Sequence, residues 1–119
     1  NQFDQTLEVE VVSIDKLFTK FGYPVFIKID TEGFEYIILK TLKDNRVRGL
    51  SFEFALPESL DDVILSVEHL NNIGYKKFNI VFGESTAFIC DENMGFLDLV
   101  NLIRQLPKMT WGDIYAFNK

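Results

Sequence analysis

Short apolar runs alternate with amphipathic segments along the whole chain, and this alternation limits the fold more than any other feature. The runs that predict strands lie at residues 7–14, 25–29, 50–54, 78–82, 86–90 and 113–117. The segments that predict helices lie at residues 15–21, 34–42, 57–73 and 93–106. Strands that alternate with helices favour right-handed crossovers in a mostly parallel sheet, with helices on both faces. At 119 residues we expect a single α/β domain over residues 1–119.

The run at 25–29, VFIKI, is nearly continuous in apolar residues, which is typical of a strand buried in a parallel sheet. In an open α/β sheet, ligands bind beyond the carboxyl ends of the strands. Asp30 ends this strand, so we expect its carboxylate at that rim, with Glu32 on the following turn. Gly33 leaves room for a ligand beside the backbone, and Glu35 falls in the first helical turn.

Three carboxylates within six residues have two interpretations. They could orient an amine, accept a proton from a hydroxyl group or hold Mg²⁺, which would support metal-dependent hydrolysis. They could equally stabilise the helix start, by a few tenths to about 1 kcal/mol each, through capping and the helix dipole. The residues by themselves leave both interpretations open.

Composition excludes several classes of function. The formal net charge of −6 would repel a nucleic acid. No apolar run reaches the roughly 18 residues that span a membrane. Cys90 is the only cysteine, so an internal disulfide is excluded and a reducing, cytoplasmic compartment is expected. With His69 as the only histidine, no metal site is assigned.

Residues 26–35, FIKIDTEGFE, together with the helix ending LKTL at 39–42, resemble the signature of the FkbM family of S-adenosylmethionine-dependent methyltransferases. The family pattern is approximately F-[IL]-K-[IL]-D-[VT]-E-G-x-E. Upstream, VVSIDKL at 11–17 is similar to the family's strand and S-[IL]-D-x-L segment. Downstream, LSFEF at 50–54 resembles a strand that ends near an acidic residue. The likeness is dense over residues 9–55 and thin, though compatible in element order, beyond them.

The resemblance implies the C-terminal half of a Rossmann-like class I methyltransferase, with strands four to seven of a seven-stranded sheet. Its last strand would run antiparallel between its two predecessors. The resemblance also implies S-adenosylmethionine as the methyl donor in the complete protein and a hydroxyl group of a sugar or small metabolite as acceptor. It implies that Asp30 and Glu32 are catalytic, that Asp30 and Gly33 contact the donor, and that Glu35 and Glu53 contact the acceptor.

The glycines depart from the family pattern, because no two of the seven are two or three residues apart and the D-x-G-[AC]-x-x-G donor turn is missing. We therefore expect a fragment without the N-terminal donor-binding half, which is inactive in isolation. The alternative is a non-catalytic α/β module that has lost the donor site and binds a partner. Halving a sheet also exposes a strand edge. We expect that edge to be hidden in a homodimer or covered by residues 7–14.

Overall fold

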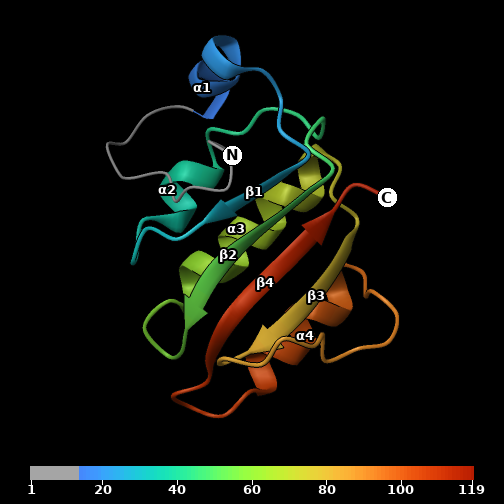
Figure 1. Ribbon diagram of the computed structural model, residues 1–119. Helices are drawn as coiled ribbons and strands as arrows, with labels where there is room; N and C mark the ends of the chain where they lie inside the picture. The colour runs from blue at the N-terminus through green and yellow to red at the C-terminus, as the bar shows by residue number, and fades with distance from the viewer. Residues whose placement is uncertain (1–13) are drawn as a thin grey trace.

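Four strands form one mixed sheet in the structure, a computed structural model that describes residues 14–119. They are β1 (Phe26–Ile29), β2 (Gly49–Ala55), β3 (Lys77–Phe82) and β4 (Trp111–Phe117). Their order across the sheet is β1-β2-β4-β3 (Figure 1). The strand predicted at residues 7–14 lies outside the described range except for Ile14, which begins the first helix.

The position of β4 confirms one part of the predicted sheet topology and contradicts another. β4 runs antiparallel to both β2 and β3 and lies between them, which confirms the expected last strand. The prediction of a mostly parallel sheet was wrong, because β1 and β2 form the only parallel adjacent pair among the described strands. The physical reason is the insertion itself: β2 and β3 point the same way, but β4 separates them and takes the hydrogen bonds of both.

The strand predicted at residues 86–90 is also wrong. This segment follows the outer edge of β3, where the Ile89 amide donates to the Ile80 carbonyl at 2.9 Å. The side chain of Asn79 then takes the place of a strand partner: its Nδ2 donates to the Cys90 carbonyl at 3.0 Å, and its Oδ1 accepts from the Cys90 amide at 3.3 Å. A side chain that occupies these backbone groups prevents a regular hairpin.

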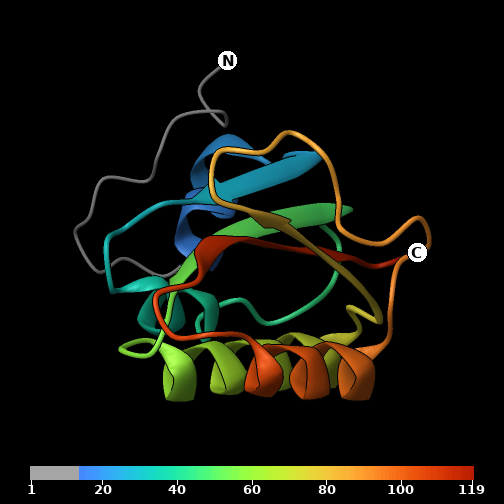
Figure 2. The same cartoon turned by 90° about the horizontal axis from the view of Figure 1, so that it is seen from below.

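Residues 14–119 contain four helices: α1 (Ile14–Phe21), α2 (Glu35–Leu39), α3 (Leu60–Ile73) and α4 (Phe96–Gln105). Figure 2 shows α2, α3 and α4 on the same side of the sheet. The prediction of helices on both faces is therefore wrong for these three. The crossovers from β1 to β2 and from β2 to β3 step in the same direction along the sheet, so right-handed connections place α2 and α3 on one face.

The core fills the space between that face and the helices. Strand residues that point towards the helices are almost fully buried: Ile27, Ile29, Leu50, Phe52, Phe54, Phe78, Ile80, Ile114 and Ala116. Val67 and Leu70 of α3 and Leu99 of α4 meet them and are inaccessible to solvent. Gly112 lies on this face, and a Cβ there would collide with the Val81 carbonyl oxygen, so β3 and β4 can approach only with glycine at this position.

α2 ends three residues earlier than predicted, and one side chain explains its end. The Thr41 hydroxyl donates to the Ile38 carbonyl at 2.7 Å, which satisfies a carbonyl of the last turn. The same oxygen accepts the Ile14 amide at 3.0 Å, so it also ties the start of α1 to the end of α2.

The opposite face of the sheet, which we call the outer face, carries the alternate residues of each strand. Aromatic rings cover its half near the start of β1. Phe88, from the segment after β3, packs on Tyr115 and Phe117 with ring centroids 5.0 and 6.2 Å apart. Phe26 of β1 lies 5.9 Å from Tyr115. The other half of this face is charged.

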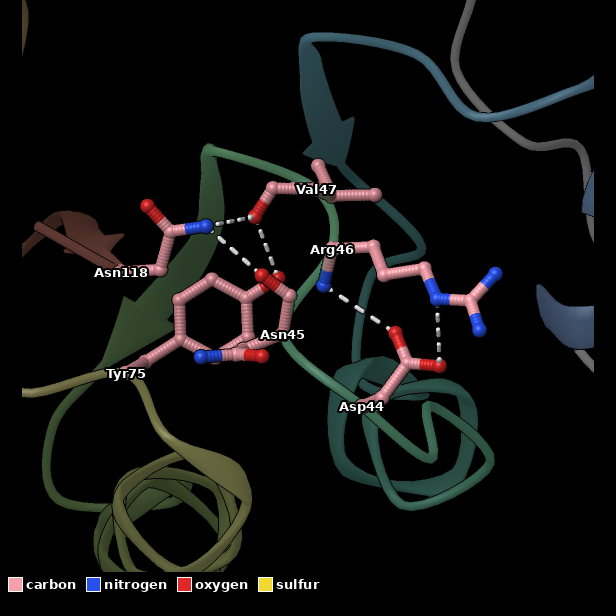
Figure 3. Close-up of polar contacts among 6 residues, drawn as sticks. All are labelled: Asp44, Asn45, Arg46, Val47, Tyr75 and Asn118. Carbon is pink, nitrogen blue, oxygen red and sulfur yellow. Dashed lines mark hydrogen bonds and ion pairs between the residues drawn. The ribbon is translucent and has the colours of Figure 1, made fainter.

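The amino end of β2 is closed by a polar network (Figure 3). The buried Tyr75 hydroxyl donates to the Val47 carbonyl at 2.6 Å, and burial raises the pKa of Tyr75. Asn118 Nδ2 donates to the Asn45 carbonyl at 2.6 Å (Figure 3). These bonds join the loop before β2 to the segments that precede β3 and follow β4. They hold this rim together and leave the opposite rim as the candidate ligand side.

Candidate functional site

The turn after β1 is the core of the candidate site. Asp30 is half-buried where the strand ends, and Thr31 is 5% exposed. Glu32 and Gly33 then adopt successive positive φ values of 52° and 109°, and both are exposed. Among residues 14–119, no atom lies within 4 Å of a Cβ added to Gly33, so this part of the chain leaves room beside the backbone. These positions agree with the predicted rim placement of Asp30, Glu32 and Gly33.

Glu35 holds this turn from the first residue of α2. Its Oε2 accepts the Thr31 amide and its Oε1 accepts the Gly33 amide, each at 3.0 Å. Hydrogen bonds from amides to an ionised carboxylate are roughly twice as strong as neutral ones. Both oxygens of Glu35 therefore already have protein partners.

A row of charged side chains continues the site across the outer face. Glu53 of β2 lies directly opposite Asp113 of β4 in the strand register. Lys28 is on the same face, two residues before Asp30, and it is exposed. Asp113 was missed by the sequence analysis, because only the antiparallel insertion of β4 brings it beside Glu53.

The charges of this row act on one another. Burial raises the pKa of Glu53, and the negative charges of Asp30, Glu35, Asp113 and Glu32 raise it further. Burial likewise raises the pKa of Asp113; Lys28 lowers it and Asp30 raises it. Ile29 pairs with Phe52, so Asp30 follows at the level of Glu53, and Glu53 pairs with Asp113; these three carboxyl groups therefore lie at one rim of the sheet. We call Asp30, Glu32, Glu53 and Asp113 the acidic rim.

Thr31 has an unusual environment. Its Oγ1 is buried and has no hydrogen-bond partner within the described residues. An unpaired buried hydroxyl group costs about 1–3 kcal/mol. This cost falls on a residue that directly follows Asp30 of the acidic rim.

The described residues contain no group of three His, Cys, Asp or Glu side chains arranged to hold a metal ion. The hypothesis of metal-dependent hydrolysis therefore gains no support from the geometry of the turn. His69 is half-buried in α3, where its Nε2 lies 2.8 Å from the Leu42 carbonyl oxygen. Among the described helices, none has the length and apolar character to cross a membrane.

The mixed sheet and the helix layer on one face define the protein as an α/β domain, with the acidic rim at the end of the parallel pair β1–β2. A sequence model of the family described as the methyltransferase FkbM domain matches residues 2–107. The chain therefore belongs to the FkbM methyltransferase domain family. No curated protein matches it.

Proposed function

We propose that this chain forms part of an S-adenosylmethionine-dependent O-methyltransferase, in which donor and acceptor meet at the acidic rim. The observation that carries the proposal is the convergence of Asp30, Glu53 and Asp113 at the end of β1 and β2 in an FkbM domain. The strand order β1-β2-β4-β3, with an antiparallel β4, is compatible with strands four to seven of a Rossmann-like seven-stranded sheet.

Methyl transfer to a hydroxyl group needs alignment of the acceptor oxygen and a group that takes its proton. Asp30 is half-buried at the strand end, where it can accept a hydrogen bond from that hydroxyl and receive the proton. Glu32 lies on the adjoining turn and supports the same role. The raised pKa values of Glu53 and Asp113 bring these carboxyl groups closer to the range of a general base. Their oxygens can also accept hydrogen bonds from further hydroxyl groups of the acceptor. The acceptor class is a sugar or another small hydroxylated metabolite.

Several features of the rim fit the methyl donor. S-adenosylmethionine carries a sulfonium cation, which supplies the methyl group when the donor is bound, and the negative rim attracts that charge. Open space at Gly33 admits a ligand to the backbone, and the unpaired Thr31 hydroxyl offers a buried hydrogen-bonding group. The glycine-rich turn of the family is missing from these 119 residues. In the complete enzyme, most donor contacts would therefore come from polypeptide other than this chain.

Calorimetry with S-adenosylhomocysteine tests the proposal. We expect micromolar-range binding by a product extended upstream through a glycine-rich turn, and weak or undetectable binding by this chain. Asp30→Asn in the extended product should lower methyl transfer at least about 100-fold, the lower end of the range for loss of a general base. Asp98→Asn, in the first turn of α4, is the matched control. An extended product that folds but does not bind the ligand would refute the proposal and favour the partner-binding module.

We also propose that the isolated chain forms a homodimer through β1. Within residues 14–119, β1 is the outer strand beside β2, and Val25 at its start is 71% exposed. An open edge of this kind is a template for pairing. Sedimentation equilibrium should give a dimer that Val25→Lys weakens; a monomer at all concentrations would contradict it.

A further inference from the structure

In the turn between β1 and α2, one residue adopts a backbone conformation that its residue type does not favour. Gly33 adopts positive φ without strain, but Glu32 also lies in the left-handed region, where side chains with a Cβ are disfavoured. Phe34, at the N-cap of α2, makes no side-chain capping bond. A conformation of this kind persists only when surrounding contacts fix it.

The Glu35 carboxylate supplies those contacts. The Thr31 amide belongs to the peptide that follows Asp30, and the Gly33 amide belongs to the peptide that follows Glu32. Both amides donate to Glu35, through separate oxygens at 3.0 Å. One side chain thus fixes the peptide plane next to each of the two carboxylates that are proposed to act in the reaction.

We infer that Glu35 is a positioning residue: it clamps the 30–33 turn and thereby sets the directions of the Asp30 and Glu32 side chains. This inference rests on the proposed function for its consequence, since Asp30 and Glu32 are the groups that would meet the acceptor. It replaces the acceptor contact expected for Glu35 with a role within the protein. The clamp itself is a property of this chain and can be tested without any ligand.

Nuclear magnetic resonance on the 119-residue chain tests the clamp. In the wild type, the Thr31 and Gly33 amide resonances should lie downfield and exchange slowly. Glu35→Gln retains one carbonyl acceptor, so one of the two amides should keep its shift, whereas Glu35→Ala should release both. The Glu32 Cα and Cβ shifts should then leave the values typical of left-handed backbone. Asp98→Asn should change none of these signals.

Activity of the extended product tests the positioning role. A misplacement of about 1 Å can lower a rate by roughly 100-fold. Glu35→Ala should therefore reduce kcat at least about tenfold with little change in the acceptor KM, and Glu35→Gln should recover part of that loss.

Two results would overturn the inference. Unchanged amide and Glu32 signals in Glu35→Ala would show that no clamp exists. An increase in KM with kcat preserved would show that Glu35 binds the acceptor directly. If the wild-type extended product fails to bind S-adenosylhomocysteine while the amide signals respond as expected, the proposed function fails and the clamp stands. If the extended product binds S-adenosylhomocysteine but Glu35→Ala leaves the amide and Glu32 signals unchanged, the clamp fails and the proposed function stands.

Discussion

Replacement of Glu53 by Gln should stabilise the folded protein at neutral pH. Glu53 and Asp113 face each other directly across β2 and β4, and like charges in that position are destabilising. Cross-strand pairs contribute roughly 0.2–1 kcal/mol, so removal of one charge should raise the free energy of unfolding by about that amount. For a domain of this size we expect an increase in Tm of about 1–4 °C.

The pH dependence gives the prediction its sharpest form. The pKa of Glu53 is raised in the folded state above its ordinary value of 4.5, so folding favours the protonated carboxyl group. The contribution of Glu53 to the free energy of unfolding is therefore fully present below the pKa of Glu53 in the unfolded chain. It is lost as pH rises through the raised pKa of Glu53 in the folded state. Glu53→Gln cannot ionise, so its advantage should appear in that pH window, persist at pH 7 and vanish in acid.

Urea unfolding at several pH values measures this effect, with Asp98→Asn as the control for loss of one negative charge elsewhere. The double variant Glu53→Gln with Asp113→Asn should gain less than the sum of the single variants, because the first substitution already removes the repulsion. A loss of stability at pH 7, or a gain of the same size at low pH, would refute the reasoning. If Glu53 also binds the acceptor, Glu53→Gln should gain stability but lose affinity for the acceptor. The repulsion between Glu53 and Asp113 would then be a cost in stability that binding requires.

Three further substitutions test individual packing and hydrogen-bonding claims by urea unfolding. Thr31→Val should stabilise the chain by about 1 kcal/mol, because it removes a buried hydroxyl group without a partner in the described residues; a decrease would reveal a partner. Gly112→Ala should destabilise it by about 1–3 kcal/mol or more, since the added Cβ collides with the Val81 carbonyl, and a neutral result would contradict the close approach of β3 and β4. Tyr75→Phe should destabilise it by about 1–3 kcal/mol through the bond lost to Val47, and an unchanged midpoint would argue that water replaces the hydroxyl group.

The candidate site was partly predictable because its first half is local in sequence. A buried apolar strand that ends at Asp30 has its terminal side chain at the sheet rim, and the glycine at 33 permits the turn that follows. The role of each residue within that turn was harder to predict from the sequence. Glu35 has the same sequence position whether it faces a ligand or folds back on the turn, and only its bonds to the Thr31 and Gly33 amides distinguish the two.

Within residues 14–119, four predicted strands and four predicted helices followed from periodicity, whereas residues 86–90 did not form the predicted strand. That segment has the composition of a strand, but the Asn79 side chain, eleven residues earlier, takes the backbone groups of Cys90. A hydrogen bond of this range leaves no trace in local hydrophobic pattern. The end of α2 depends on a local hydrogen bond, from the Thr41 hydroxyl to the Ile38 carbonyl, which hydrophobic periodicity also does not reveal.

By itself the sequence determined the α/β class, the strand that carries Asp30 and, through the 26–35 signature, the family. These depend on local periodicity and on residues that adjoin one another in the chain. The entry of β4 between β2 and β3 was expected only through the family resemblance, and tertiary structure alone decided that α2 and α3 share a face and that Asp113 stands opposite Glu53. Strand order and register are long-range choices, made by the packing of surfaces far apart in the sequence, and no local pattern encodes them.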